Sequence, residues 1–97
     1  MSKKTLFIVD IDGTLTIPTT STPTPVTDAD WQEMYKTAEA NQKVLDKLTS
    51  MTREGDVIML CTGRRDSNRA ITVEWLRDKL IYAALLMRDD YDMRSNV

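Results

Sequence analysis

Asp10 and Asp12, two aspartates one residue apart, are the residues of this sequence best suited to chemistry. They follow the apolar run 6–9 and precede Gly13 and Thr14. Residues at i and i+2 of an extended segment project to the same side, so we expect the two carboxylates to lie close together. Such a pair is unfavourable unless one carboxylate keeps its proton or a cation lies between them. The spacing therefore predicts carboxylate chemistry supported by a hard divalent cation.

The glycine and threonine after the aspartates are candidates for the same site. Gly13 permits a positive φ or a close backbone approach, and Thr14 adds a hydroxyl and a backbone N–H. An alternative interpretation is a buried strand that runs into an Asx-type turn, where aspartates form local hydrogen bonds. That alternative explains one aspartate well and two poorly, so we favour the functional interpretation.

A second candidate segment, Thr62-Gly63, follows the apolar run 57–61. In open α/β folds, anions bind where a strand of a parallel sheet ends in a small hydroxyl residue and a glycine. Thr62 and the N–H of Gly63 are therefore candidates for binding phosphoryl oxygens. Pairs of this kind are also common in ordinary turns, so the prediction depends on the two aspartates being nearby.

Three arginines, Arg64, Arg65 and Arg69, add positive charge beside this segment. One interpretation is a solvated start of a helix. The other is binding of a nucleotide or an end-of-strand phosphate, for which the planar guanidinium is suited. The sequence favours neither over the other.

Length and composition exclude several classes of protein. A chain of 97 residues forms one small domain at most, and a net charge of −2 gives no long-range attraction to nucleic acid or to an anionic membrane. The absence of histidine excludes Ser-His triads and histidine general bases. The single Cys61 is expected to be a buried, reduced thiol. No segment near the N-terminus has the length of a signal peptide or membrane span, so we expect a cytoplasmic protein with no membrane partner.

The apolar pattern predicts the elements that position these residues. The runs 5–9, 57–61 and 81–87 are apolar at nearly every position, which is typical of strands covered on both faces. One helix is expected from about residue 27 to 54, and another from about residue 68, with Ala70, Val73 and Leu76 on its buried side. The order β-α-β-α-β indicates an α/β fold with a parallel, Rossmann-like sheet. If strands one and two are neighbours, Thr62 lies near Asp10.

Two further segments leave alternatives open. Residues 16–27 are rich in Pro, Thr and Ser and are expected to form an exposed loop, either a linker or a small lid over the aspartates. Trp31 and Tyr35 lie on one face of the first expected helix. They could form a base-stacking platform, but an aromatic stripe at helical spacing is more often part of the core.

The segment Asp10-Ile11-Asp12-Gly13-Thr14-Leu15 resembles the first motif of the haloacid dehalogenase (HAD) superfamily of phosphatases and phosphotransferases. The resemblance implies that Asp10 is the nucleophile and forms an aspartyl-phosphate. It implies that Asp12 protonates the leaving group and later activates water. It also implies Mg²⁺ as cofactor, held by the Asp10 carboxylate and the Asp12 backbone carbonyl. The loop 16–27 stands where a cap would be inserted and is too short for a folded cap domain.

The closest likeness within the superfamily is to the 3′-phosphatase domain of phage-type polynucleotide kinase/phosphatase, carried by residues 62–64 and 87–94. It implies an Mg²⁺-dependent phosphomonoester hydrolase that acts on a polynucleotide 3′-phosphate or a nucleotide. A small-metabolite or 5′-nucleotide phosphatase is the alternative within the same class. A non-catalytic remnant that binds phosphate, or that serves only in assembly, is the alternative from another class.

The resemblance also requires a lysine beyond Arg94 and a further strand that ends in acidic residues, whereas the sequence ends at Val97. We therefore expect 1–97 to be a single HAD-like domain that is incomplete at its C-terminus. Asp89, Asp90 and Asp92 precede the place of that lysine, which disfavours them as replacements for the acidic residues. Without that further strand beside it, strand one would have an open edge. We therefore expect low activity and self-association through that edge.

Overall fold

The computed structural model describes residues 4–17 and 24–92 of the chain. Three strands form one parallel sheet in sequence order: β1 (Leu6–Asp10), β2 (Val57–Cys61) and β3 (Ala84–Leu86). Four α-helices accompany them: α1 (Asp28–Lys36), α2 (Gln42–Arg53), α3 (Arg69–Leu76), which follows a 3₁₀ turn, and α4 (Arg88–Tyr91). The predicted α/β fold with a parallel, Rossmann-like sheet is confirmed.

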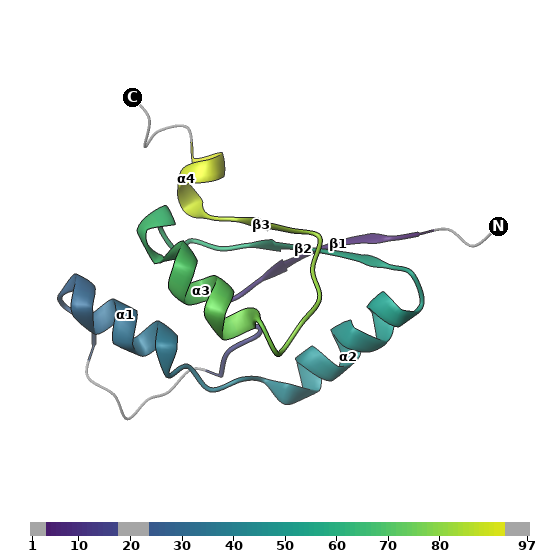
Figure 1. The fold of residues 1–97 in the computed structure, drawn as a ribbon, viewed down its shortest axis with the longest axis horizontal. Coiled ribbons are helices and arrows are strands. Elements are labelled where there is room, and N and C mark those ends of the chain that lie inside the picture. Colours follow the sequence, from purple (N-terminus) through teal and green to yellow (C-terminus); the bar gives the residue numbers. More distant parts are fainter. Residues whose placement is uncertain (1–3, 18–23, 93–97) are drawn as a thin grey trace.

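Helices α1, α2 and α3 lie on one side of the sheet (Figure 1). This follows from the strand order, because strands added in the same direction through right-handed crossovers carry their connections over the same face. The core fills the space between that face and the helices. The turn after β1 contributes the buried Ile11 and Leu15, and Leu80 follows α3. The buried members on β2, α2 and α3 are Ile58, Leu60, Leu45, Leu48, Trp75 and Leu76.

The opposite face of the sheet carries exposed apolar side chains on β1. Leu6 is 53% exposed and Ile8 68%, whereas Phe7 and Val9 between them pack against the core. The prediction of a strand covered on both faces is therefore wrong for β1. Its side chains alternate between two faces, and the described part of the chain supplies a helical layer to only one of them.

Strand β3 is shorter than the predicted run 81–87. Pairing with β2 begins at Met59 and Ala84, and Ile81 is 78% exposed ahead of it. Apolar character at Ile81 is therefore not a sign of strand pairing here. The run 81–87 therefore contains a strand of three residues, preceded by a segment that is not part of the sheet.

The single helix expected from about residue 27 to 54 is also wrong, because α1 and α2 are separate helices. Between them the backbone pairs with the segment after the first motif. The N–H of Asn41 donates to the Leu15 carbonyl at 2.7 Å, and Thr16 forms an antiparallel bridge with Ala40. These bonds replace the helical ones and stop the helix, a competition that apolar spacing does not reveal.

The same bridge changes the start of the predicted loop. Thr16 is only 7% exposed, so the loop expected at 16–27 does not begin as an exposed segment. Residues 18–23 of that loop lie outside the described residues. None of the helices within residues 4–17 and 24–92 is long and apolar enough to cross a membrane.

The buried face of α3 agrees with the predicted one at Leu76 and differs at Ala70 and Val73, which are exposed. Thr72, Trp75 and Leu76 are buried, whereas Val73 is 40% exposed. The spacing of apolar residues fits either face. The choice is made by the Trp75 indole, whose N–H donates to the Ala38 carbonyl at 2.9 Å and holds that side of the helix inward.

Candidate active site

A tight turn directly follows β1 and shapes the first motif. The carbonyl of Ile11 accepts hydrogen bonds from the N–H groups of the third, fourth and fifth residues after it. Gly13 adopts the predicted positive φ, 81°, and its N–H donates to the Thr16 hydroxyl at 3.1 Å. The N–H of Thr14 donates to Ile11 at 3.2 Å. The N–H groups of both candidate residues thus serve the turn itself.

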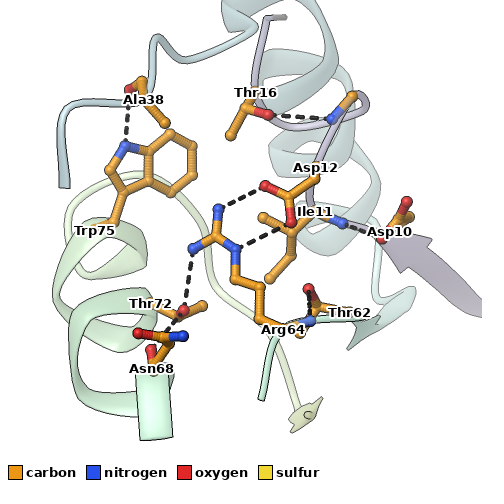
Figure 2. A network of polar contacts seen from close by, with 11 residues as sticks. Asp10, Ile11, Asp12, Thr16, Ala38, Thr62, Arg64, Asn68, Thr72 and Trp75 are labelled. Atoms are coloured by element: carbon orange, nitrogen blue, oxygen red, sulfur yellow. Dashed lines mark hydrogen bonds and ion pairs between the residues drawn. The ribbon is translucent and has the colours of Figure 1, made fainter. Parts of the chain in front are cut away.

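The carboxylates of Asp10 and Asp12 point in different directions (Figure 2). Asp10 is exposed, and its Oδ1 accepts from the N–H of Ile11 at 2.9 Å. The expectation of two carboxylates on one side is wrong, because β1 ends at Asp10 and Asp12 already lies in the turn. The i, i+2 rule holds only within a strand.

Asp12 is held by Arg64 in a bidentate ion pair. Asp12 Oδ2 accepts from Arg64 Nε at 3.0 Å, and Oδ1 accepts from Nη2 at 2.8 Å. Two parallel bonds of this kind fix the orientation of a carboxylate as well as its position. When Asp12 is ionised, its negative charge is therefore balanced by an arginine rather than by a cation shared with Asp10.

Arg64 is 2% exposed, and two more groups surround its guanidinium. Nη1 donates to the hydroxyl of Thr72 at 3.0 Å, and the guanidinium carbon lies 3.8 Å from the ring centroid of Tyr35. A buried charge is tolerated only when it is paired and hydrogen-bonded, and an aromatic face adds to this. Arg64 is therefore a built-in part of the site and does not belong to a solvated cluster.

Three elements deliver the groups around Arg64. Arg64 follows β2, Thr72 comes from α3, and Tyr35 comes from α1. The Thr72 hydroxyl donates to the Asn68 carbonyl at 2.8 Å while it accepts from Arg64 (Figure 2). Burial raises the pKa of Tyr35; the charge of Asp12 adds to this rise and that of Arg64 opposes it.

Thr72 was missed at the sequence level, and for Tyr35 only the predicted burial was right. Tyr35 is 8% exposed, which confirms a core position, but its contact with Arg64 was not foreseen. The feature that could have identified Thr72 was its hydroxyl on the helix face that also carries the buried Trp75. That face was itself assigned wrongly, so the signal could not be used.

The second candidate segment lies beside the first, as predicted. Asp10 pairs in register with Cys61, which places Thr62 next to the turn after β1. Thr62 is 1% exposed and its hydroxyl oxygen accepts from the N–H of Arg64 at 3.2 Å, whereas Gly63 is exposed. Gly63 is thus the more accessible of the two predicted phosphate ligands. Cys61 is half-buried rather than fully buried.

Arg65 and Arg69 contact aspartates near the end of the described chain. Arg65 Nη1 lies 2.8 Å from Asp89 Oδ1, and Arg69 Nη2 lies 2.6 Å from Asp90 Oδ2. Arg69 Nε also lies 2.7 Å from Asp66 Oδ1. These pairs tie α4 to the start of α3. Binding of substrate by Arg65 and Arg69 stays a prediction, and such binding would have to compete with these carboxylates.

Backbone amides also bind the two aspartates of α4. The pKa of Asp89 is held below its usual value mainly by a hydrogen bond from the N–H of Asp66, and Arg65 adds a smaller effect. The N–H of Met87, followed by Arg69, does the same for Asp90. Both carboxylates are therefore occupied by structural contacts, which agrees with their unsuitability as replacements for a metal-binding pair.

The oxygen donors near β1 fit a magnesium ion. Mg²⁺ prefers hard oxygen ligands and commonly takes only one or two carboxylates together with waters and substrate phosphate. The exposed Asp10 carboxylate and the Asp12 carbonyl are donors of this type. Within the described residues, no three or more Asp, Glu, Cys or His side chains gather into a metal-binding group.

A groove of about 410 Å³ lies elsewhere, on α3 and the end of α1. It is lined by Lys36, Ala70, Ile71, Glu74, Trp75 and Lys79. None of the predicted site residues lines it, so it has no part in the chemistry considered above.

Solved structures similar to this chain include two complexes described as Pnkp1/Rnl/Hen1, the second as an RNA repair complex. They are 29% and 28% identical to it, with TM-scores of 0.68 and 0.70, and cover 94% and 96% of its residues. The chain spans only 30% and 28% of the length of those chains. A crystal structure from Vibrio cholerae shares the fold at 22% identity, with a TM-score of 0.59, covering 86% of this chain and 68% of its own.

Comparison with families gives the most extensive match. None of the curated proteins is similar enough to count as a match. The family model described as the phosphatase domain of polynucleotide kinase PNKP matches residues 4–97. The matched range contains Asp10, Asp12 and Arg64. The chain therefore belongs to the HAD-like family of polynucleotide kinase PNKP phosphatase domains.

Proposed function

We propose that this chain is part of an Mg²⁺-dependent phosphomonoesterase that acts on a polynucleotide 3′-phosphate or on a nucleotide. One observation carries the proposal: the exposed Asp10 ends β1 beside an Asp12 that a buried arginine holds in place. Family membership supports a phosphatase. The description of a similar structure as part of an RNA repair complex supports a nucleic-acid end as substrate.

In the first step, a carboxylate oxygen of Asp10 attacks phosphorus and the bond from phosphorus to the sugar oxygen breaks. The leaving oxygen takes a proton from Asp12, which becomes a carboxylate. Each carboxyl oxygen has a second lone pair, so Asp12 can carry this proton while it accepts from Arg64. The product of the step is an aspartyl-phosphate and a free hydroxyl on the substrate.

In the second step, water attacks the phosphorus of the aspartyl-phosphate. The Asp12 carboxylate takes a proton from that water, and the bond between phosphorus and Asp10 breaks to release inorganic phosphate. Arg64 contributes by orientation, since its two bonds keep Asp12 in one direction through both steps. Both aspartates end in their starting states.

The Asp10 carboxylate and the Asp12 carbonyl would hold Mg²⁺, which would offset the charge on the phosphoryl oxygens. Gly63 would donate its N–H to one of those oxygens from the neighbouring turn. Thr62 would support this turn through its bond to Arg64 rather than contact the phosphate directly.

The test is release of inorganic phosphate from a 3′-phosphorylated oligonucleotide by the full-length gene product with and without Mg²⁺. Asp10→Asn removes the nucleophile and should lower the rate by at least about a thousandfold. Asp46→Asn is the matched control, because that exposed carboxylate lies on α2, away from the site, and accepts a hydrogen bond from Gln42. Release that survives Asp10→Asn, or that needs no divalent ion, would refute the proposal.

The alternatives predict different results in the same assay. A small-metabolite or 5′-nucleotide phosphatase would prefer a sugar phosphate or a 5′-phosphate to the 3′-phosphorylated oligonucleotide. A non-catalytic domain would bind phosphate or metal with no turnover of any of the three. Intact Asp10 and Asp12 disfavour this last outcome.

For the partner, we propose self-association of two copies through β1. Within the described residues no strand pairs with the outer edge of β1, and its exposed Leu6 and Ile8 extend that edge as an apolar surface. Unpaired edges of this kind recruit further strands. Ile8→Lys should shift the chain toward monomer in sedimentation velocity, and Val26→Lys, at another highly exposed position, should not. A wild-type chain that is monomeric at every concentration would contradict the proposal.

A further inference from the structure

Trp31 is a large aromatic side chain that remains 39% exposed, on the same helix as the buried Tyr35. The two rings lie one helical turn apart, with centroids at 5.8 Å and planes inclined by 38°. Helix α1 lies toward the end of the molecule at which the three strands end (Figure 1). Helix α1, which carries Trp31, is therefore at the end of the molecule that carries the candidate active site.

A continuous set of contacts joins Trp31 to Asp12. The Tyr35 ring contacts the Trp31 ring in a tilted arrangement, and its centroid lies 3.8 Å from the guanidinium carbon of Arg64. Arg64 in turn holds both oxygens of Asp12. Because Tyr35 and Arg64 are buried, they link the helix that carries the indole to the candidate general acid.

A core role explains Tyr35 and does not explain Trp31. The other tryptophan, Trp75, is 6% exposed and donates its indole N–H to a carbonyl, as a core tryptophan does. Trp31 instead presents a hydrated aromatic surface above a buried partner. Such a surface stacks well on a nucleobase, because every base has an aromatic face.

The charges around Trp31 define which part of a nucleotide it could bind. Asp28 and Asp30 occupy the first turn of α1 and are exposed. These carboxylates repel phosphate, so the indole is unsuited to the sugar-phosphate backbone. An uncharged base avoids this repulsion.

We infer that Trp31 stacks on a nucleobase of the substrate whose phosphate lies at Asp10, and so selects nucleotides over other phosphomonoesters. The inference rests on the proposed function and adds the residue that reads the non-reacting part of the substrate. Stacking on an aromatic side chain does not distinguish among the four bases, so Trp31 would provide affinity without sequence preference.

The test compares kcat/KM for a 3′-phosphorylated oligonucleotide with kcat/KM for p-nitrophenyl phosphate, which has no base. In the full-length gene product, Trp31→Ala should lower the ratio of the two by about tenfold, and Trp31→Phe should restore most of it. Ile81→Ala is the matched control, since it removes an exposed apolar side chain before the amino end of β3. The control should leave the ratio unchanged.

The outcomes separate the inference from the function beneath it. Wild-type hydrolysis of both substrates with an unchanged ratio in Trp31→Ala would overturn the inference and leave the phosphatase intact. Absence of hydrolysis by the wild type would overturn both. As a second readout, a nucleoside 3′-monophosphate should quench tryptophan emission of the full-length gene product, and Trp31→Phe should remove that quenching. Equal quenching by inorganic phosphate would also overturn the inference.

Discussion

Arg64 and Arg69 stand five residues apart and both pair with aspartates, yet their surroundings differ. The Arg64 side chain is 1% exposed, whereas the Arg69 side chain is 38% exposed. Arg64 makes two parallel bonds to one carboxylate and also contacts a hydroxyl and a ring. Arg69 bonds to Asp66 and Asp90 on the surface. Each guanidinium makes two hydrogen bonds to carboxylate oxygens, so the contrast lies in burial and in the further contacts of Arg64.

The difference in burial arises from the position of each arginine relative to its strand or helix. Arg64 follows β2 directly, and its carbonyl accepts from the N–H of Arg88 at 2.8 Å, which holds its backbone between two segments. Its side chain therefore enters the space between α1 and α3. Arg69 begins α3, and its partly exposed guanidinium donates to the Leu85 carbonyl as well as to its two aspartates. A buried guanidinium that loses its environment costs several kcal/mol, whereas an exposed pair contributes about 0–1 kcal/mol.

The largest expected effect is that of Arg64→Ala. It removes a buried side chain and leaves Thr72 and Asp12 without their partner, so the free energy of unfolding should fall by about 3–4 kcal/mol. Arg64→Lys should recover only part of this, because an ammonium cannot make the same parallel pair of bonds. Urea unfolding measures both. If Arg64→Ala and Arg69→Ala lowered the free energy of unfolding equally, burial would not distinguish the two arginines.

A smaller effect is expected at the ring above Arg64. Tyr35→Leu keeps an apolar side chain but removes the aromatic face, and should lower the free energy of unfolding by about 1 kcal/mol. Tyr35→Phe keeps the face and serves as control. The same urea titration measures both variants, and a loss in Tyr35→Phe as large as in Tyr35→Leu would assign the effect to the hydroxyl.

Much of the fold followed from the sequence because local rules decide it. The run 57–61 is β2, and the predicted helix end at Glu54-Gly55 is confirmed, with Gly55 at a φ of 98°. Neighbouring strands one and two were predicted from their order and are paired, which brings Thr62 beside Asp10. Each of these features depends on residues close together in the sequence or on a topological rule.

The parts that could not be predicted depend on contacts between distant segments. The break between α1 and α2 exists because 15–17 pairs with 39–41, and no local pattern signals that pairing. Likewise, Arg64, Arg65 and Arg69 look equivalent as a sequence. Only the packing of α1 and α3 around β2 makes the first a buried partner of Asp12. Roles of charged residues are thus less predictable than the positions of apolar ones.

Because Arg69 is partly exposed, we expect Arg69→Ala to have little effect on the free energy of unfolding. Its two pairs are partly solvated and screened by salt, so the free energy of unfolding should fall by less than about 1 kcal/mol. The loss should shrink further at high salt, whereas the loss in Arg64→Ala should persist because its environment excludes water. Urea titrations at low and high salt measure this. A salt-independent loss at Arg69 would indicate a role in packing.

The smallest effect concerns acid and is confined to α4. The pKa of Asp90 is held below 3.8, first by the N–H of Met87 and then by Arg69. A carboxyl group whose folded pKa is depressed contributes stability above its unfolded value, and the contribution is lost as pH falls through the folded value. Between pH 7 and 5 we therefore expect no change at α4, and below pH 3.8 its docking should weaken.

The amide signal of Met87 in NMR spectra follows this titration directly, because its N–H donates to Asp90 at 2.8 Å. Its midpoint should lie below 3.8, and Asp90→Asn should abolish the pH dependence while an amide oxygen still accepts the bond. The pair of Asp12 with Arg64 differs from this exposed contact, because Arg64 is only 2% exposed. If the Met87 midpoint lay at or above 3.8, the exposed contacts would add nothing to the folded state, and Arg64 alone would account for the role of the three arginines in stability.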